Sequence, residues 1–117
     1  MREILFYKTE SGKCPIEEFL ESLKAKQARK VTWVLSLVEE LPSIPSKYFK
    51  KLVNTNDIWE IRINYGGENF RLLGFFDGPQ LIILNHAFHK KTQKTPRQAI
   101  QIAETRKRKY FNNRRLK

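Results

Sequence analysis

Three runs of alternating apolar and polar residues, separated by glycine-containing turns, constrain the fold of this chain more than any other feature. The runs cover residues 57 to 65, 70 to 77 and 81 to 88. Alternation with a period of two indicates strands that are buried on one face. The Gly66-Gly67 and Gly78-Pro79 dipeptides between the runs favour tight turns. The sequence therefore predicts a three-stranded antiparallel meander.

The residues before the meander predict one strand and two helices. Residues 2 to 7 are typical of a short strand, and Ser11-Gly12 ends it as a turn. Pro15 suits the first position of a helix whose apolar residues recur at helical spacing up to Leu23. A second helix is predicted over residues 28 to 38, ending before Pro42. Because neither Gly nor Pro lies between residues 24 and 27, one bent helix remains an alternative.

After the meander, Thr95 and Pro96 predict the N-cap and the first residue of a basic helix that continues to about residue 110. The length of 117 residues suits a single domain, and no repeat or linker divides the chain. The expected fold is therefore α/β of the α+β type, in one domain over residues 1–117. It consists of an N-terminal strand, two helices, an antiparallel meander sheet and a basic C-terminal helix.

The charge of the chain is concentrated near its C-terminus. The net charge is +11, and the last 28 residues hold eleven basic side chains against the single acid Glu104. A local excess of one sign suggests an anionic partner, such as nucleic acid, an anionic membrane surface or an acidic protein. The alternative is that these residues only keep the surface solvated.

Several classes of protein are disfavoured by the sequence. No apolar stretch reaches membrane-spanning length, the N-terminus has no signal-peptide pattern, and a single cysteine, Cys14, excludes an internal disulfide. A cytoplasmic location is expected. His86, His89 and Cys14 do not have zinc-site spacing, and the common nucleotide-phosphate loops and nucleophile elbows are missing. We therefore expect no metal and no cofactor.

The predicted turns bring basic residues together on one face of the meander. If Gly66-Gly67 is the centre of the first hairpin, Arg62 lies opposite Arg71. If Gly78-Pro79 is the centre of the second, Arg71 lies opposite His86. Like charges in such a row destabilise a sheet by about 0.2–1 kcal/mol per pair, and a shared anion relieves this repulsion. A slip of one residue in either turn breaks the row.

The other face of the meander is expected to pack against the helices. Its residues are Trp59, Ile61, Ile63, Phe70, Leu72, Phe76, Leu81 and Ile83. Each polar residue also has a simpler interpretation. Glu60 and Arg62 suit the polar face of a surface strand, and a single histidine such as His86 is more often packed in a core. Arg71 is the hardest to explain in this way, because its neighbours on the same face are apolar and an unpaired buried arginine is costly.

The chain resembles the phage-derived HigB-like branch of the RelE/HigB toxin superfamily. The elements that carry the resemblance are Trp59-Glu60-x-Arg62, Phe70-Arg71, Phe75-Phe76-Asp77-Gly78 and His86-x-Phe88-x-Lys90-Lys91-Thr92-x-Lys94-Thr95-Pro96. The segment from Pro15 to Leu23 is also similar, so that the resemblance covers nearly the whole chain. It implies a small fold in which two N-terminal helices pack on a largely antiparallel sheet.

The resemblance also implies a function. Toxins of this kind in type II toxin-antitoxin systems are mRNA interferases that enter the A site of the 30S subunit and cut the message. A cognate antitoxin, often a helix-turn-helix protein, neutralises them. The strand arginines of the family match Arg62 and Arg71, and the segment that closes its last strand matches residues 86 to 91. The chain departs from some relatives at its end, where residues 114 to 117 lack their terminal His or Tyr.

The expected chemistry is metal-independent attack of the RNA 2′-hydroxyl on the adjacent phosphate. Arg62 and Arg71 are expected to stabilise the developing charge, and His86 to protonate the leaving oxygen. Glu60 or a lysine is the candidate base. Contacts to flanking phosphates or bases are expected from Lys50, Lys51, Phe88, Lys90, Lys91 and Lys94. Two alternatives remain: a ParE-like toxin that inhibits its target by binding, and a basic RNA-binding protein without toxicity.

Overall fold

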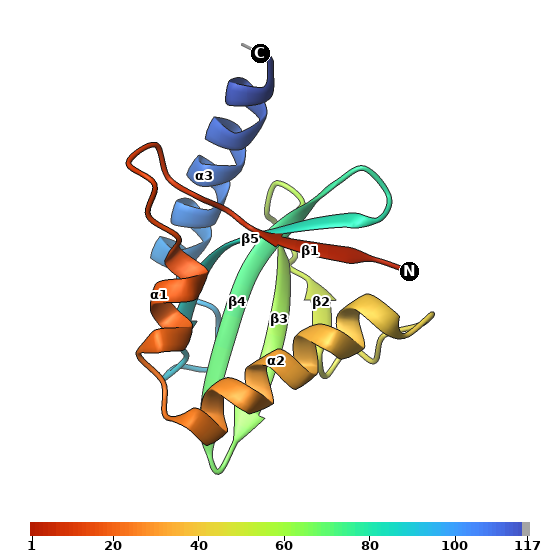
Figure 1. Cartoon of the computed structure of the whole chain (residues 1–117), viewed down its shortest axis with the longest axis vertical. Coiled ribbons are helices and arrows are strands. Elements are labelled where there is room, and N and C mark those ends of the chain that lie inside the picture. The colour runs from red at the N-terminus through yellow and green to blue at the C-terminus, as the bar shows by residue number, and fades with distance from the viewer. Residues whose placement is uncertain (116–117) are drawn as a thin grey trace.

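The computed structural model describes residues 1–115, which form five strands and three helices (Figure 1). The elements in chain order are β1 (Glu3–Phe6), α1 (Pro15–Glu21), α2 (Ala25–Glu40), β2 (Phe49–Lys51), β3 (Trp59–Tyr65), β4 (Glu68–Asp77), β5 (Leu81–His89) and α3 (Arg97–Arg115). The α+β fold is confirmed. The chain between residues 21 and 25 separates α1 from α2, so the alternative of one bent helix is wrong.

The five strands form one sheet in the order β1-β5-β4-β3-β2. The predicted meander of β3, β4 and β5 is antiparallel, whereas β1 pairs with β5 in parallel at one edge of the sheet. The other edge is β2, a three-residue strand that the sequence analysis did not predict. So short a segment lacks enough alternation to be recognised as a strand.

The first hairpin has the predicted register. Tyr65 pairs with Glu68, and the two-residue turn between them has φ values of 55° at Gly66 and 84° at Gly67. Positive φ at both central residues is the geometry that favours glycine in such hairpins. As a result, Arg62 lies opposite Arg71 as predicted.

The second hairpin corrects the predicted row. Arg71 lies opposite Phe88, and His86 lies opposite Leu73. Asp77 pairs with Leu81, so the turn holds three residues instead of two, and a β-bulge between Leu73 and Gly74 adds one further residue. The two offsets together move His86 two positions along its strand. It therefore keeps the predicted face of the sheet but leaves the row of the arginines.

Gly74 explains why the bulge forms at this position. The register passes from Leu73 opposite His86 to Gly74 opposite Leu84, which leaves Asn85 as the additional residue. A Cβ atom on residue 74 would collide with the carbonyl oxygen of Ile83 and lie 3.0 Å from its carbonyl carbon. Only glycine permits this close approach of the two backbones.

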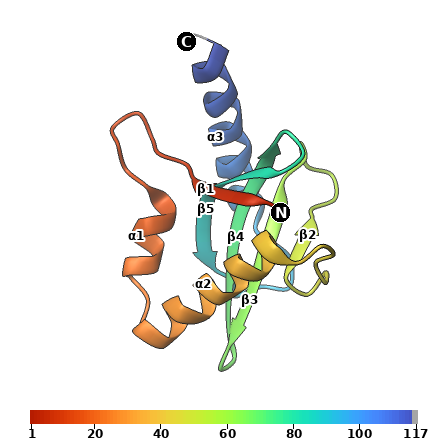
Figure 2. The same ribbon diagram turned by 45° about the vertical axis from the view of Figure 1, so that its right-hand side comes forward.

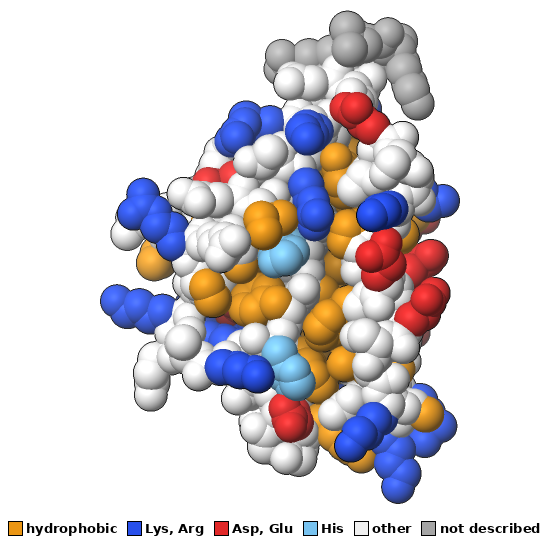
Figure 3. Space-filling model, turned by 90° about the vertical axis from the view of Figure 1, so that its left-hand side faces the viewer, with side chains coloured by type: hydrophobic (Ala, Val, Ile, Leu, Met, Phe, Trp, Pro, Cys, Tyr) orange, Lys and Arg blue, Asp and Glu red, His pale blue; other side chains and the backbone are white. Residues whose placement is uncertain are grey.

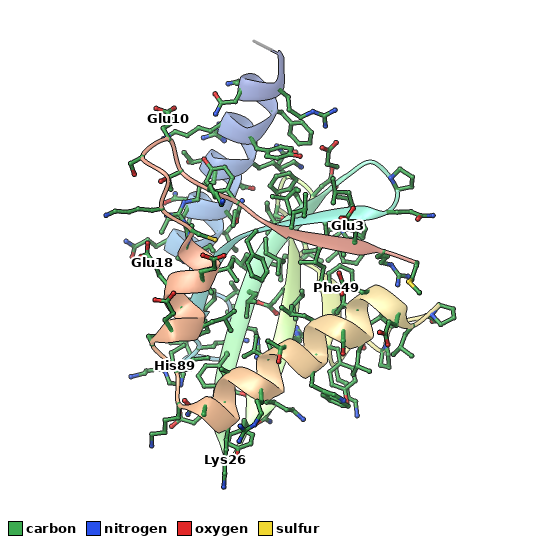
Figure 4. The ribbon with its side chains drawn as sticks, viewed as in Figure 1. Glu3, Glu10, Glu18, Lys26, Phe49 and His89 are labelled. Atoms are coloured by element: carbon green, nitrogen blue, oxygen red, sulfur yellow. The ribbon has the colours of Figure 1, made fainter. Side chains whose placement is uncertain are left out.

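Helices cover both faces of the sheet, with α1 and α2 on one side and α3 on the other (Figure 2). The larger core lies under α1 and α2, where Figure 4 labels Phe49. Leu81 and Ile83, which we expected in that core, pack instead on the α3 side with Phe75 and Tyr110. The three-residue turn shifts this end of β5 by one residue, so that Ile82 and Leu84 face α1 and α2. The bulge adds its residue only beyond this end, between Leu84 and His86.

The third helix begins at Arg97, one residue after the predicted start, and continues past residue 110. Pro96 precedes it and accepts a backbone hydrogen bond from Ile100 at 3.2 Å. The Thr95 hydroxyl donates to the carboxylate of Glu60 on the sheet. Thr95 therefore connects the loop to β3. Because the helix begins at Arg97, Thr95 lies one position too early to be its N-cap, and that prediction is wrong.

Candidate functional site

A fully buried carboxylate lies at the centre of the candidate site. Glu60 on β3 has no exposed surface, and its Oε1 atom lies 2.9 Å from Nε of Arg62 and 3.6 Å from Nε of Arg71. Its other oxygen, Oε2, accepts the hydrogen bond from Thr95. Removing a carboxylate from water is costly unless cations and donors surround it, and here two guanidinium groups and a hydroxyl do so.

The alternation along β3 and the hairpin register produce this cluster. Glu60 and Arg62 are two residues apart and so share a face, and Arg71 lies opposite Arg62 on β4. The sequence analysis anticipated that an anion would relieve the repulsion between the two arginines. In the structure the neighbouring Glu60 is this anion, which the register alone did not indicate.

Arg71 is held in place but keeps hydrogen-bonding capacity. One terminal nitrogen, Nη1, donates to the carbonyl oxygen of Phe70 at 3.0 Å, and the buried Nε has no hydrogen-bond partner among the described residues. Burial lowers the pKa of the guanidinium, Glu60 opposes this effect, and Arg62 adds to it. A partly desolvated guanidinium is a strong binder of phosphate.

The loop of residues 90 to 96 brings Lys90 to the two arginines. The Lys90 amide donates to the carbonyl of Asn69 at 2.8 Å, and Thr95 holds the other end of the loop on Glu60. Burial lowers the pKa of the Lys90 ammonium group, and Arg71 lowers it further, against the opposing effect of Glu60. The cluster thus holds three cations and one carboxylate, which leaves it positive overall.

Two hollows meet at Arg71. The first, of about 580 Å³, lies between the β3–β4 turn and the loop after β5, and its lining includes Arg71, His89, Lys90 and Lys91. The second, of about 360 Å³, lies on the β3 side, and Arg62 and Arg71 both contribute to its wall. A bound polymer that places one phosphate at the arginines therefore has room for its neighbouring units in the two hollows.

His86 is close to α3 and away from the arginine row. Its ring stacks on Phe88 with 5.6 Å between the centroids. Burial, with the nearby guanidinium of Arg106 adding to the effect, lowers the pKa of His86 to about 4. The imidazole is therefore neutral at pH 7, which argues against a role as a proton donor at that pH.

His89 was missed by the sequence analysis. Its Nε2 atom lies 2.5 Å from Oε2 of Glu68, its ring lies on that of Phe70, and it lines the larger hollow together with Arg71. Figure 4 labels it at the end of β5, and Figure 3 shows the histidines on a face of the molecule that also carries Lys and Arg side chains. In the sequence, His89 lies inside the segment of residues 86 to 91 that carries the resemblance and directly precedes Lys90 and Lys91, but no role was assigned to it.

The predicted phosphate-binding residues are distributed unequally around the cluster. Lys50 on β2 pairs in register with Glu60, and Phe88 pairs with Arg71, so both belong to neighbouring positions of the sheet. Lys51 forms an ion pair with Asp57 at 2.7 Å. Lys91 and Lys94 are exposed in the loop after β5.

Part of the basic charge of α3 has a structural role. Arg106 donates to the carbonyl oxygen of Asn85 at 2.6 Å, and Lys107 donates to that of Asn56 at 2.7 Å. Arg114 and Tyr110 both bind the carboxylate of Asp77. These contacts anchor the helix to the sheet and to the bulge. The charge of α3 is therefore only partly available for a partner.

Neither a metal cluster nor a membrane helix is found in the described part of the chain. Within residues 1–115, no group of three or more His, Cys, Asp or Glu side chains is arranged to hold a metal ion. None of the helices there combines the length and apolar character needed to cross a membrane.

Comparison with known proteins assigns the family. A comparison with the curated proteins finds no match. The family model described as "Phage derived protein Gp49-like (DUF891)" matches residues 18–108, which include β3, β4, β5 and the loop that follows. The chain therefore belongs to the Gp49-like family, a family of RelE/HigB-like toxins that pair with antitoxins.

Proposed function

We propose that the protein is the toxin of a type II toxin-antitoxin system and acts as a ribosome-dependent mRNA interferase. The observation that carries this proposal is the pair of arginines, Arg62 and Arg71, held side by side by the buried carboxylate of Glu60. A phosphodiester gains negative charge as it is attacked, and two fixed guanidinium groups stabilise this charge. Membership of the Gp49-like toxin family supports the same proposal.

In the proposed reaction the 2′-oxygen of the RNA attacks the adjacent phosphorus and the bond to the 5′-oxygen breaks. The products are a 2′,3′-cyclic phosphate and a 5′-hydroxyl. The base that takes the proton of the 2′-hydroxyl is Lys90, because it adjoins both arginines and because burial and Arg71 lower its pKa. The leaving 5′-oxygen takes a proton from water.

Glu60 and His86 have different roles in this proposal from those first expected. Glu60 is fully buried and bonded on both oxygens, so it positions the arginines and the loop. His86 is neutral and stacks on Phe88, so it supports the floor of the site. The catalytic residues are then Arg62, Arg71 and Lys90.

The proposed partners follow from the family and the charge. The substrate is mRNA in the A site of the 30S subunit in the cytoplasm, and the neutralising partner is a cognate antitoxin, which we expect to be a helix-turn-helix protein. Lys50, Lys91 and Lys94 contact flanking phosphates, and their contribution depends on salt concentration.

The test is induction of the wild-type chain and of Arg71→Ala in bacteria, with growth recorded and transcript 5′ ends mapped. Arg108→Ala is the matched control, because Arg108 is exposed on α3 and, among the described residues, its side chain bonds within the helix, to Thr105. We expect growth arrest and codon-phased cuts for the wild type and the control, and neither for Arg71→Ala. Arrest without cuts would instead assign the protein to toxins that act by binding.

A further inference from the structure

The smaller hollow at Arg71 has a wall of cations from three parts of the chain. β2 pairs with β3 only from Trp59 to Ile61, so the next part of β3 is flanked by other elements. The hollow has a volume of about 360 Å³. Lys30 on α2 and Lys47 in the segment before β2 line it together with the two arginines, Arg62 and Arg71. None of the predicted phosphate-binding residues lies in this wall. The two arginines make the hollow continuous with the candidate site.

An aromatic pair lies beside the two lysines. Tyr48 lines the hollow, and the ring of Trp33 meets it edge to face, with 6.0 Å between centroids and an interplanar angle of 85°. Lys30 Nζ lies 4.6 Å from the centroid of the Trp33 ring, and Lys47 Nζ lies 4.9 Å from that of Tyr48. Each ammonium group is thereby held against an aromatic ring.

Trp33 is 47% exposed, although it belongs to a helix that packs on the core. A single exposed aromatic residue is ordinary on a protein surface. Here, however, the ring is combined with two lysines and adjoins two arginines that are suited to phosphate. Cations that follow a backbone, together with aromatic rings for the bases, are the combination that binds single-stranded nucleic acid.

We propose that this hollow binds the nucleotide next to the cleaved phosphate of a single-stranded RNA. Its base stacks on the Trp33–Tyr48 pair, and its phosphate lies between Lys30 and Lys47. The position relative to the cleaved bond rests on the proposed function, whereas the binding itself does not. An acidic protein segment is the competing occupant, and it would need the lysines but not the aromatic rings.

The experiment uses tryptophan fluorescence and a single-stranded 2′-O-methyl RNA hexamer, which cannot be cleaved by its own 2′-oxygen. The full chain carries Trp59→Phe, because Trp59 is the other tryptophan and stacks on Phe49 in the core. We expect the hexamer to quench Trp33. Lys30→Ala with Lys47→Ala weakens binding about tenfold or more and reduces the slope of log K against log salt by about 0.7, the value for the one phosphate that lies between these lysines.

The matched control removes two exposed lysines of the N-terminal segment, Lys8→Ala with Lys13→Ala, and leaves affinity nearly unchanged. An absence of quenching, equal weakening by both double variants, or displacement of the hexamer by polyglutamate at equal ionic strength would overturn the proposal. The chain with Arg71 intact separates the two proposals. Quenching by the hexamer in a protein whose induction produces no transcript cuts leaves this site standing while the nuclease assignment fails, whereas transcript cuts without quenching overturn this site alone.

Discussion

The Thr95 hydroxyl donates its hydrogen bond to Glu60, a carboxylate with no exposed surface on a strand 35 residues earlier in the chain. This contact holds the loop after β5 against the sheet, and the same carboxylate holds Arg62 from the other side. Lys90 begins this loop. The geometry of the three cations therefore depends on one buried anion and one hydroxyl group.

Thr95→Val tests the hydroxyl. Valine keeps the shape of threonine but leaves Oε2 of Glu60 without this donor, and an unsatisfied buried acceptor costs about 1–3 kcal/mol. We expect a lower free energy of unfolding in urea and slower RNA cleavage. Thr95→Ser retains the donor and is the control. Equal stability of the valine and serine variants would contradict the structural role of this bond.

Glu60→Gln separates positioning from base catalysis. The amide keeps the size of the side chain but removes the charge between Arg62 and Arg71. We expect the cleavage rate to fall about tenfold or more, because the repulsion between the arginines is no longer offset. The pH–rate profile of the residual activity should keep its shape. If the acidic limb of this profile disappeared, Glu60 would be the base and its assignment here would be wrong.

His86 should titrate far below an ordinary histidine. Its pKa is about 4 in the folded protein, through burial first and Arg106 second, against about 6.5 in the unfolded chain. The unfolded state therefore binds the proton first, so the stability from neutral His86 is complete above pH 6.5 and is lost as the pH falls through 4. NMR titration of the imidazole measures the midpoint.

Arg106→Gln provides the control for this titration. Removing the guanidinium should raise the midpoint of His86 by less than burial lowers it, since burial is the larger cause. A midpoint near 6.5 in the wild-type protein would show that the ring is hydrated, and it would restore His86 as a candidate proton donor at neutral pH.

Gly74→Ala tests the bulge. Because the added Cβ meets backbone atoms of Ile83, which cannot move without disrupting the ladder between β4 and β5, we expect a loss of about 3 kcal/mol in unfolding free energy. Gly78→Ala is the comparison. Residue 78 has φ of 81° and open space around it, so only backbone strain of about 1–2 kcal/mol is expected there. Equal losses would mean that the bulge adapts to the methyl group.

The sequence predicted local pairing well and long-range adjustment poorly. Two glycines with a fixed preference for positive φ were enough to place Arg62 opposite Arg71. A three-residue turn and a bulge are not apparent from alternation, because each changes the register by a single residue. For this reason His86 was placed beside Arg71, although it lies opposite Leu73.

In the candidate site, too, local features were predicted and long-range contacts were not. The arginine pair was predicted from the strands, whereas the burial of Glu60 depends on Thr95, which approaches from a loop. His89 and Lys30 reach the two hollows only through tertiary packing, so no spacing in the sequence marked them. The assigned roles of Glu60, Arg62, Arg71 and Lys90 stay predictions until cleavage is measured.

The most direct measurement is the chemistry of the cut end. Purified protein would be incubated with ribosomes programmed with a defined message, and the 3′ end of the upstream fragment would be identified by mass. We predict a 2′,3′-cyclic phosphate, a loss of rate of about 10²–10³ in Arg71→Ala, and no cleavage when the attacked nucleotide is 2′-deoxy. A cut that persists at the 2′-deoxy position, or in Arg71→Ala at the wild-type rate, would contradict the account.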